Sequence, residues 1–446
     1  FRTAQMSNYQ LNFSGGNDKT KYFVSGGYLS QDGVIINSDL KRYSFRVNVE
    51  SQMNKRVKVG ANITPSYTFS NQSLAEGNWQ GGGIIQSAIT AGPHLTPYDE
   101  FGNLEYNTIN YAPFNILSEL DNNYLNLNNM DLKVQGGLRY KVLPQLTASV
   151  DAAYRYATTE RQHYIKEESN MANAFRAAGD ATIADGNKYL YNDPDLPNSL
   201  PQVILPEGGF FNSNMNNLKN FYFRSNLEFD ETFKQHHRLN LFGSFEIRHT
   251  DRQNSEYEGV GYQYANGGLV NPNYRFFKKM IEAGDPYFGM GYEYDRFVAG
   301  MFRAAYAYKD KYSINATTRI DGSNKLGESK VARWLPTWNV SGKWNIDQED
   351  FFNEDNGILS AVGVRATYGL VASLGSATNS APVFYNRISY RPYEDEKEAI
   401  TFISGLENSE LTWEKLYELN IGADLQLFNK IDVTADWYKR DIFDLI

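Results

Sequence analysis

The chain of 446 residues contains no cysteine and only five histidines. Without cysteine there is no disulfide framework and no thiolate metal site, and the absence is neutral about redox compartment. The histidines are scattered. The adjacent pair His236-His237 fits a solvated turn better than a ligand set, because metal-binding histidines are usually spaced along the chain. We therefore expect no metal and no cofactor.

Long apolar runs are also missing, and no run reaches the roughly 20 residues that a membrane-spanning helix needs. This does not exclude a membrane, because a spanning β-barrel alternates apolar and polar residues and so has the mean hydropathy of a soluble protein. The net charge of −9 is spread along the chain. A nucleic-acid partner would require clustered Lys and Arg, so that class is disfavoured.

Catalytic motifs are absent too, since no Ser/His/Asp or Cys/His constellation is apparent in the sequence. We expect no catalytic residues and no enzyme activity. The stretch 193–195 offers two aspartates to calcium, but it fits a proline-containing loop better, because calcium takes six or more oxygen ligands. The stretch 321–324 resembles the start of a calcium loop but lacks the closing acidic residue at the expected position.

What the chain does contain is period-two alternation, clearest over residues 130–156. One set is apolar or aromatic, and the other is polar or charged. Similar alternation recurs in about fourteen segments. Most of them are close to or above the roughly 10 residues of a spanning strand. Short connections alternate with longer ones along the chain, and the longest loops are expected at 71–128, 161–217, 254–293 and 371–415. An antiparallel meander has this pattern when one end faces the periplasm and the other faces outside.

The fold class predicted from this pattern is all-β, a transmembrane antiparallel β-barrel with long extracellular loops and short periplasmic turns. In lipid every backbone group must be hydrogen-bonded internally, and a closed barrel achieves this with strands. A soluble sandwich or propeller array also alternates and remains the alternative. In the barrel, the residues expected to face lipid are Leu132, Val134, Leu138, Tyr140, Val150 and Tyr154. Those expected to face the lumen are Lys133, Gln135, Arg139, Asp151 and Arg155.

The long loops are rich in aromatic residues, and short helices are expected within 167–178 and 273–283. Aromatic rings stack on sugar faces and pack against peptide side chains, and Tyr keeps a polar group. They also pack loops together or contact partner proteins, and both roles stay open. The candidates for contact with a substrate or a lid are Trp79, Tyr98, Phe101, Tyr106, Tyr111, Tyr262, Tyr264, Tyr274 and Tyr287.

Three stretches carry a more specific signal. They are NFSGGNDKTKYFVSGGYLSQDGVIINSDLKRYSFRVNV at 12–49, RIDGSNKLG followed by RWLPTWNVSGKW within 319–344, and ENSELTWEKLYELNIGADLQLFNKIDVTADWYKRDIFDLI at 407–446. In this order they resemble the SusC/RagA family of TonB-dependent outer-membrane transporters of Bacteroidetes.

The resemblance implies a 22-stranded barrel in the cell outer membrane, plugged by an N-terminal domain, energised by TonB and lidded by a SusD-like surface lipoprotein. Residues 1–446 would form a partial barrel domain, with the plug, the TonB box and the remaining strands lying outside this stretch. The function implied is uptake of oligosaccharides or peptides. The alternatives are a passive porin or structural barrel, and a soluble β-rich adhesin or hydrolase module.

Overall fold

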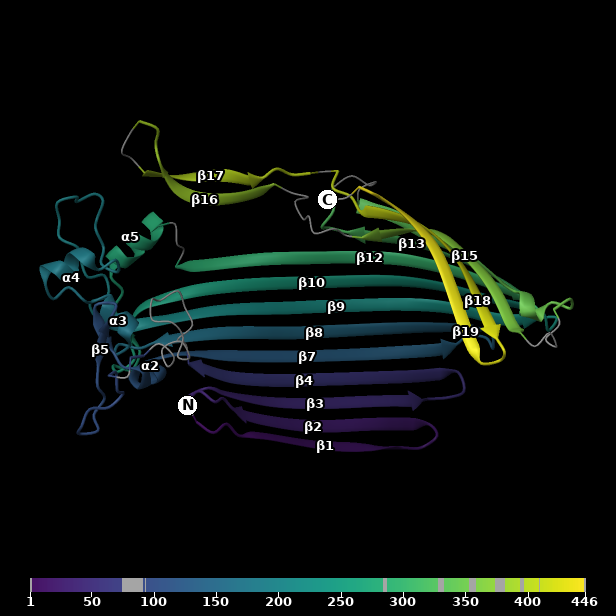
Figure 1. Ribbon diagram of the computed structural model, residues 1–446, viewed down its shortest axis with the longest axis horizontal. Coiled ribbons are helices and arrows are strands. Elements are labelled where there is room, and N and C mark those ends of the chain that lie inside the picture. The colour runs from purple at the N-terminus through teal and green to yellow at the C-terminus, as the bar shows by residue number, and fades with distance from the viewer. Residues whose placement is uncertain are drawn as a thin grey trace.

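A computed structural model describes residues 2–73, 91–92, 94–283, 287–327, 333–352, 358–373, 382–393, 397–408 and 410–444. Over these residues the chain forms one 15-stranded antiparallel sheet (Figure 1). The path through the sheet follows chain order, through β1 (Met6–Gly16), β2 (Thr20–Asp32), β3 (Asp39–Gln52), β4 (Val57–Ser73), β7 (Asn123–Lys141), β8 (Leu146–Ile165), β9 (Gly209–Phe233), β10 (His237–Gln263), β12 (Phe288–Tyr308), β13 (Tyr312–Ser323), β14 (Trp334–Asn345), β15 (Leu359–Ser373), β18 (Glu414–Leu427) and β19 (Ile431–Phe443). The short strand β11 (Leu269–Val270) pairs with β10 off this path.

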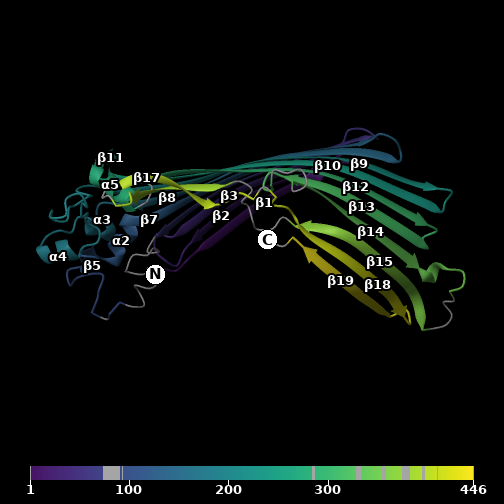
Figure 2. The same ribbon diagram turned by 90° about the horizontal axis from the view of Figure 1, so that it is seen from above.

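The sheet is a curved wall with a concave and a convex face (Figure 2). This confirms the predicted antiparallel meander, with strand following strand along the chain. Its regularity follows from the sequence period, because successive side chains of a strand point to opposite faces. In the wall each strand pairs with the strands that come before and after it in the sheet path, and short turns or long connections join them.

The register of β7 and β8 separates the two sets of residues. Val134 lies opposite Tyr154 and Leu138 opposite Val150, whereas Lys133 lies opposite Arg155. Directly paired residues of an antiparallel ladder lie on the same face of the sheet. The apolar and the charged sets thus occupy opposite faces, as the alternation predicts.

Tight turns close the strands at one end of the wall. Two consecutive residues with positive φ stand at several tips, such as Lys309 and Asp310 (51° and 55°) or Phe428 and Asn429 (54° and 53°). A turn of type I′ requires positive φ at both central residues and matches the twist of the flanking strands. We call this end of the wall the turn end.

The strands reach further at the other end than the sequence predicts. Loops were expected over 161–217 and 254–293, but β8 continues to Ile165, β9 begins at Gly209 and β10 continues to Gln263. The extensions carry polar residues on both faces, for example Asn212, Asn214, Asn216 and Asn217. Ladder hydrogen bonds do not need an apolar face, so pairing continues where the alternation signal is lost.

Beyond these extensions lies a cap, formed by residues 94–122, 166–208 and 264–283. It contains α2 (Ile116–Asn122), α3 (Asn170–Ala174), α4 (Ala181–Gly186), α5 (Tyr274–Ala283) and the hairpin of β5 (Asn107–Ile109) and β6 (Ala112–Phe114) (Figure 1). The predicted helices within 167–178 and 273–283 are confirmed by α3 and α5.

The cap has its own apolar core, continuous with the tops of the long strands. The cluster joins Ile165, Phe210 and Val260 of β8, β9 and β10 to cap residues that include Phe175, Ile204 and Leu205, and its remaining buried members are Ala112, Ala172, Ala174, Tyr189, Tyr191, Phe276 and Met280. Burying such side chains stabilises by about 1.5–3 kcal/mol each. The cap is thus a packed body and not a set of independent loops.

Two smaller elements complete the described structure. The hairpin of β16 (Val383–Tyr390) and β17 (Lys397–Gly405) forms a separate two-stranded sheet, and the short helix η1 (Ile346–Gln348) precedes β15. None of the helices within the described ranges is long and apolar enough to cross a membrane.

Candidate functional site

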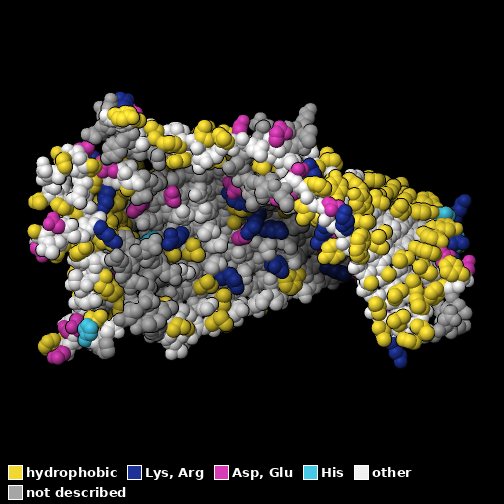
Figure 3. All heavy atoms as spheres, turned by 45° about the horizontal axis from the view of Figure 1, so that its top comes forward, with side chains coloured by type: hydrophobic (Ala, Val, Ile, Leu, Met, Phe, Trp, Pro, Cys, Tyr) yellow, Lys and Arg dark blue, Asp and Glu magenta, His cyan; other side chains and the backbone are white. Residues whose placement is uncertain are grey.

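The concave face of the wall is polar and the convex face is apolar. Figure 3 shows hydrophobic side chains gathered over the outer surface of the wall around β15, β18 and β19, and Lys and Arg side chains in the recess beside it. Several of the convex side chains are large and exposed, such as Val134 (39% exposed) and Tyr154 (44%). A folded chain rarely exposes so continuous an apolar surface without a lipid or protein environment to cover it.

A hollow of about 940 Å³ lies in the concave face and spans β1 to β9. Three of the side chains expected to face a lumen line it, namely Lys133, Gln135 and Arg155. Asp151, a fourth, lines a second hollow of about 450 Å³ towards the turn end. Arg139 lies on the same face, because it pairs with Ser149 two positions from Asp151.

Charges in the larger hollow are unequal. Its lining contains Arg46, Lys133 and Arg155 but only one carboxylate, Asp131. Asp131 accepts hydrogen bonds from Nε and Nη2 of Arg155 at 3.0 and 2.5 Å. Among the described residues, no carboxylate forms an ion pair with Arg46 or Lys133, and both side chains are exposed. The hollow therefore presents two cations that have no counter-charge in the described wall.

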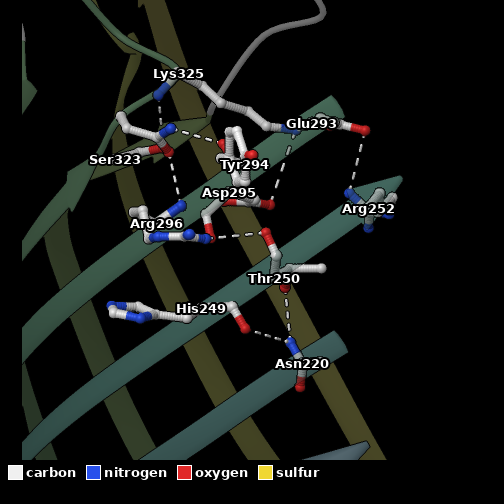
Figure 4. A network of polar contacts seen from close by, with 11 residues as sticks. Asn220, His249, Thr250, Arg252, Glu293, Tyr294, Asp295, Arg296, Ser323 and Lys325 are labelled. Atoms are coloured by element: carbon white, nitrogen blue, oxygen red, sulfur yellow. Dashed lines mark hydrogen bonds and ion pairs between the residues drawn. The ribbon is translucent and has the colours of Figure 1, made fainter. Parts of the chain in front are cut away.

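The row of facing residues that contains Lys133 and Arg155 continues across the wall. Arg155 lies opposite Asn220, Asn220 opposite Thr250, and Thr250 opposite Asp295. Nδ2 of Asn220 donates to Oγ1 of Thr250 at 2.7 Å (Figure 4). A continuous polar row thus leads from the hollow to the cap end of β12.

A second charged group lies at that point, and we call it the rim network (Figure 4). Lys325 donates to Glu293 at 3.1 Å and lies 3.8 Å from Asp295, and Arg252 lies 3.4 Å from Glu293. The side chain of Asn324 donates to the carbonyl of Tyr294 and accepts from the N–H of Arg296, both at 2.7 Å. Each cation of the rim network therefore has an anionic partner.

The rim network was not predicted from the sequence. Its residues come from β10, β12 and the connection after β13, which are far apart in the sequence. The available signal was the alternation of Tyr292, Glu293, Tyr294 and Asp295, which places two carboxylates on one face of a strand. Half of that signal, Tyr292 and Glu293, lay within 254–293, which was predicted as a loop.

At the junction of the wall and the cap, polar groups are buried. Glu119 accepts from the N–H of Asn170 at 2.8 Å and from Nδ2 of Asn123 at 2.9 Å, and its burial raises the pKa of the carboxyl group. Oδ1 of Asn123 lies 2.7 Å from Nε2 of His163. Burial, followed by the charge of Arg161, lowers the pKa of His163 to about 4. His163 is therefore neutral near pH 7.

Asp193, Asp195 and Glu282 form the one group of carboxylates close enough to hold a metal ion among the residues that the structure describes. The ammonium group of Lys278 lies between them, at 2.6 Å from Asp193, 2.5 Å from Asp195 and 3.9 Å from Glu282. The hydrogen bond from Lys278 lowers the pKa of Asp193. A lysine thus provides the positive charge here and ties α5 to the connection between α4 and β9.

The predicted aromatic contact residues fall into two groups in the cap and at its junction with β10 and β12. Four are strongly exposed, namely Tyr98, Phe101 (88% exposed), Tyr106 and Tyr274 (66%). The others hold the cap together. Tyr111 donates to the carbonyl of Gly186 at 2.6 Å, Tyr264 donates to that of Phe210 at 2.7 Å, Tyr262 packs edge-on against Tyr264, and Tyr287 packs against Phe277. Trp79 lies outside the described residues.

Comparison with known proteins gives relatives along the whole chain. It is 25% identical over 466 residues to TonB-dependent receptor P3 of Formosa agariphila, and the match covers 100% of this chain and 41% of that protein. It is 23% identical to TonB-dependent receptor SusC of Bacteroides thetaiotaomicron, covering 100% of this chain and 42% of that one. The chain therefore spans about two fifths of the length of these relatives. No protein-family model matches the chain.

Solved structures agree on the fold. The RagAB peptide importer in its closed-closed state superposes with a TM-score of 0.72 at 19% identity, covering 100% of this chain and 45% of that one. The open-open state gives a TM-score of 0.68 at 20% identity. Together these matches show that the chain is similar to a segment of a SusC/RagA-like TonB-dependent transporter barrel, which supports a place in the outer membrane.

Proposed function

We propose that the chain forms part of the barrel of an active outer-membrane importer for oligosaccharides or peptides. In this proposal the concave wall lines the lumen, the cap end faces outside, and the turn end faces the periplasm. The observation that carries the proposal is the hollow of about 940 Å³ in the polar face of the wall. A wall of this kind gives a hydrophilic ligand a route through an apolar membrane.

The convex face would meet lipid. Leu132, Val134, Leu138, Tyr140, Val150 and Tyr154 share one face of β7 and β8. A closed barrel removes unpaired strand edges from lipid, and strands beyond β1 and β19 would complete it. We propose transport and not catalysis, in keeping with relatives that are named as receptors.

Energy and partners would come from outside this segment. A plug inside the barrel would respond to TonB, and a SusD-like surface lipoprotein would close over the cap end. The exposed rings of Tyr98, Phe101, Tyr106 and Tyr274 are the side chains that we propose for contact with the lid or the ligand. Tyr111, Tyr262, Tyr264 and Tyr287 would position them by holding the cap together, and Trp79 stays a candidate for contact.

Isolation from its own cells tests the proposal. The full-length protein is purified in mild detergent and everything that accompanies it is identified by mass spectrometry. A co-purifying surface lipoprotein, with plug peptides in the same polypeptide, supports the importer. A detergent-soluble barrel with neither would favour a passive porin, and a protein that stays soluble without detergent would contradict both.

A further inference from the structure

We propose that the hollow binds an anionic ligand, one that carries carboxylate or sulfate groups, through Arg46 and Lys133. This inference rests on the proposed import function and names the chemical class of what is imported. The whole chain has a net charge of −9, so a cationic hollow does not follow from a generally basic composition. It is a local feature of one part of the inner wall.

The cations of the hollow lie in one row across the strands. Lys133 on β7 faces Arg155 on β8 and Thr64 on β4. Arg46 on β3 lies between Ser44, which faces Ser66, and Val47, which faces Ile63, so the same register places it opposite Thr64. Neighbouring strands lie about 4.8 Å apart, so positive charges recur at intervals of about 5–10 Å along the row.

Arg155 differs from the other two because Asp131 holds its guanidinium group on two nitrogens. Arg46 and Lys133 have no such carboxylate in the described wall, and the rim network in the same row shows that this chain does pair its charges elsewhere. Free guanidinium and ammonium groups bind carboxylate or sulfate through charge-assisted hydrogen bonds. The two unpaired cations therefore suit an anion that arrives with the ligand.

The neutral polar side chains of the lining suit the uncharged polar parts of such a ligand. Gln10, Ser25, Thr64, Gln135, Asn220 and Tyr222 supply neutral donors and acceptors around the cations. The volume of about 940 Å³ is within the range of small-molecule sites. An acidic oligosaccharide and an acidic peptide share this chemistry, whereas a cationic ligand would be repelled.

The test measures binding to the purified full-length protein, not transport, so that it is independent of the import experiment. Four labelled probes form two matched pairs. One pair is a uronic-acid oligosaccharide and its carboxyl-reduced neutral counterpart, and the other is a glutamate-containing peptide and its glutamine counterpart. The proteins compared are wild type, the double variant Arg46→Gln/Lys133→Gln, and the control Lys55→Gln/Lys430→Gln. The control removes the same charge at exposed lysines of the turn end.

In the Arg46→Gln/Lys133→Gln variant, binding of at least one acidic probe should weaken roughly tenfold to thirtyfold, since each solvated charge contact contributes about 1 kcal/mol. Its neutral counterpart should change less than about twofold, and added salt should weaken the wild-type affinity for the acidic probe. The pair that responds identifies the source of the anion, glycan or peptide.

Four results would overturn the proposal. Wild-type protein could bind acidic and neutral probes equally, or fail to bind either acidic probe. The double variant could lose acidic and neutral probes to the same extent, which is the result expected if the cations hold the plug in place. Lastly, the turn-end control could reproduce the loss, in which case overall charge and not the hollow would explain it.

Discussion

The hollow and the rim network lie along one row of the same inner wall, yet they differ in how many of their cations are paired with a carboxylate. At the rim, Lys325 and Arg252 each reach a carboxylate within 4 Å. In the hollow, Arg155 is paired with Asp131 while Arg46 and Lys133 are not. The difference separates two uses of charge. Paired charges link neighbouring strands and stabilise the fold only modestly, whereas unpaired charges remain available to a ligand.

The largest effect is expected from a change that puts a charge on the convex face of the wall instead of the concave face. Val134 and Gln135 are adjacent, but Gln135 lines the hollow and Val134 lies on the convex face. Val134→Arg should cost roughly 2–4 kcal/mol and impair barrel assembly, because the charge would enter the bilayer. Gln135→Arg should be tolerated. Heat-modifiable mobility of the membrane-inserted protein measures both, and equal tolerance would contradict the assigned orientation.

The second prediction separates the cap from the hollow by means of pH. The pKa of His163 is about 4 in the folded chain, below the usual value of about 6.5. The folded state disfavours the protonated ring of His163. The neutral ring therefore makes its full contribution to stability above about pH 6.5, and this contribution is lost as the pH falls towards 4. The difference corresponds to about 3 kcal/mol.

Hydrogen exchange of α2 and the cap end of β8 provides the measurement. Exchange, corrected for its intrinsic pH dependence, should accelerate between neutral pH and about pH 4.5, and His163→Gln should remove most of this pH dependence. The turns at the turn end should not respond in the same way. An unchanged exchange pattern in wild type would show that His163 does not couple the cap to the wall.

The third prediction adds an unpaired cation to the hollow. Asp131→Asn removes the carboxylate that holds Arg155 and so makes the row more positive. Acidic probes should then bind about fivefold tighter, since one additional solvated charge contact is worth about 1 kcal/mol. Titration with the matched probes measures this, and weaker or unchanged binding would mean that Asp131 positions Arg155 and does not compete with the ligand.

The smallest effect is expected at the rim. Lys325→Gln removes the ion pair with Glu293, which is half exposed, and such pairs contribute about 0.2–1 kcal/mol. The thermal unfolding temperature should fall slightly, and the affinity for acidic probes should not change. A loss of acidic-probe binding comparable to that of Lys133→Gln would erase the distinction between the two regions.

Much of the wall could be predicted from the sequence. The period-two alternation of 130–156 assigns each residue to a face without knowledge of its partners, because the side-chain period is fixed by strand geometry. For this reason Lys133, Gln135 and Arg155 were placed together on one face, and the structure brings them to one hollow.

The rest depended on contacts between distant segments. The cap core joins Ile204 to Phe210 and Phe276, and no local pattern states that these loops pack together. Arg46 and Lys133 are 87 positions apart, and only the pairing of β3, β4 and β7 puts them in one row. The cap-end extension of β9 lacks apolar alternation, and the alternation at 292–295 did not reveal the full length of β12 because 254–293 was predicted as a loop.

Uptake by living cells is the measurement that distinguishes energised import from passive diffusion. Cells with and without the gene are given labelled mixtures of oligosaccharides and of short peptides, with and without a protonophore that collapses the proton gradient. An energised importer should take up at least one mixture in a way that requires the gene and stops when the gradient is lost. Gene-dependent uptake that persists with the protonophore would identify a passive pore and would rule out energised import.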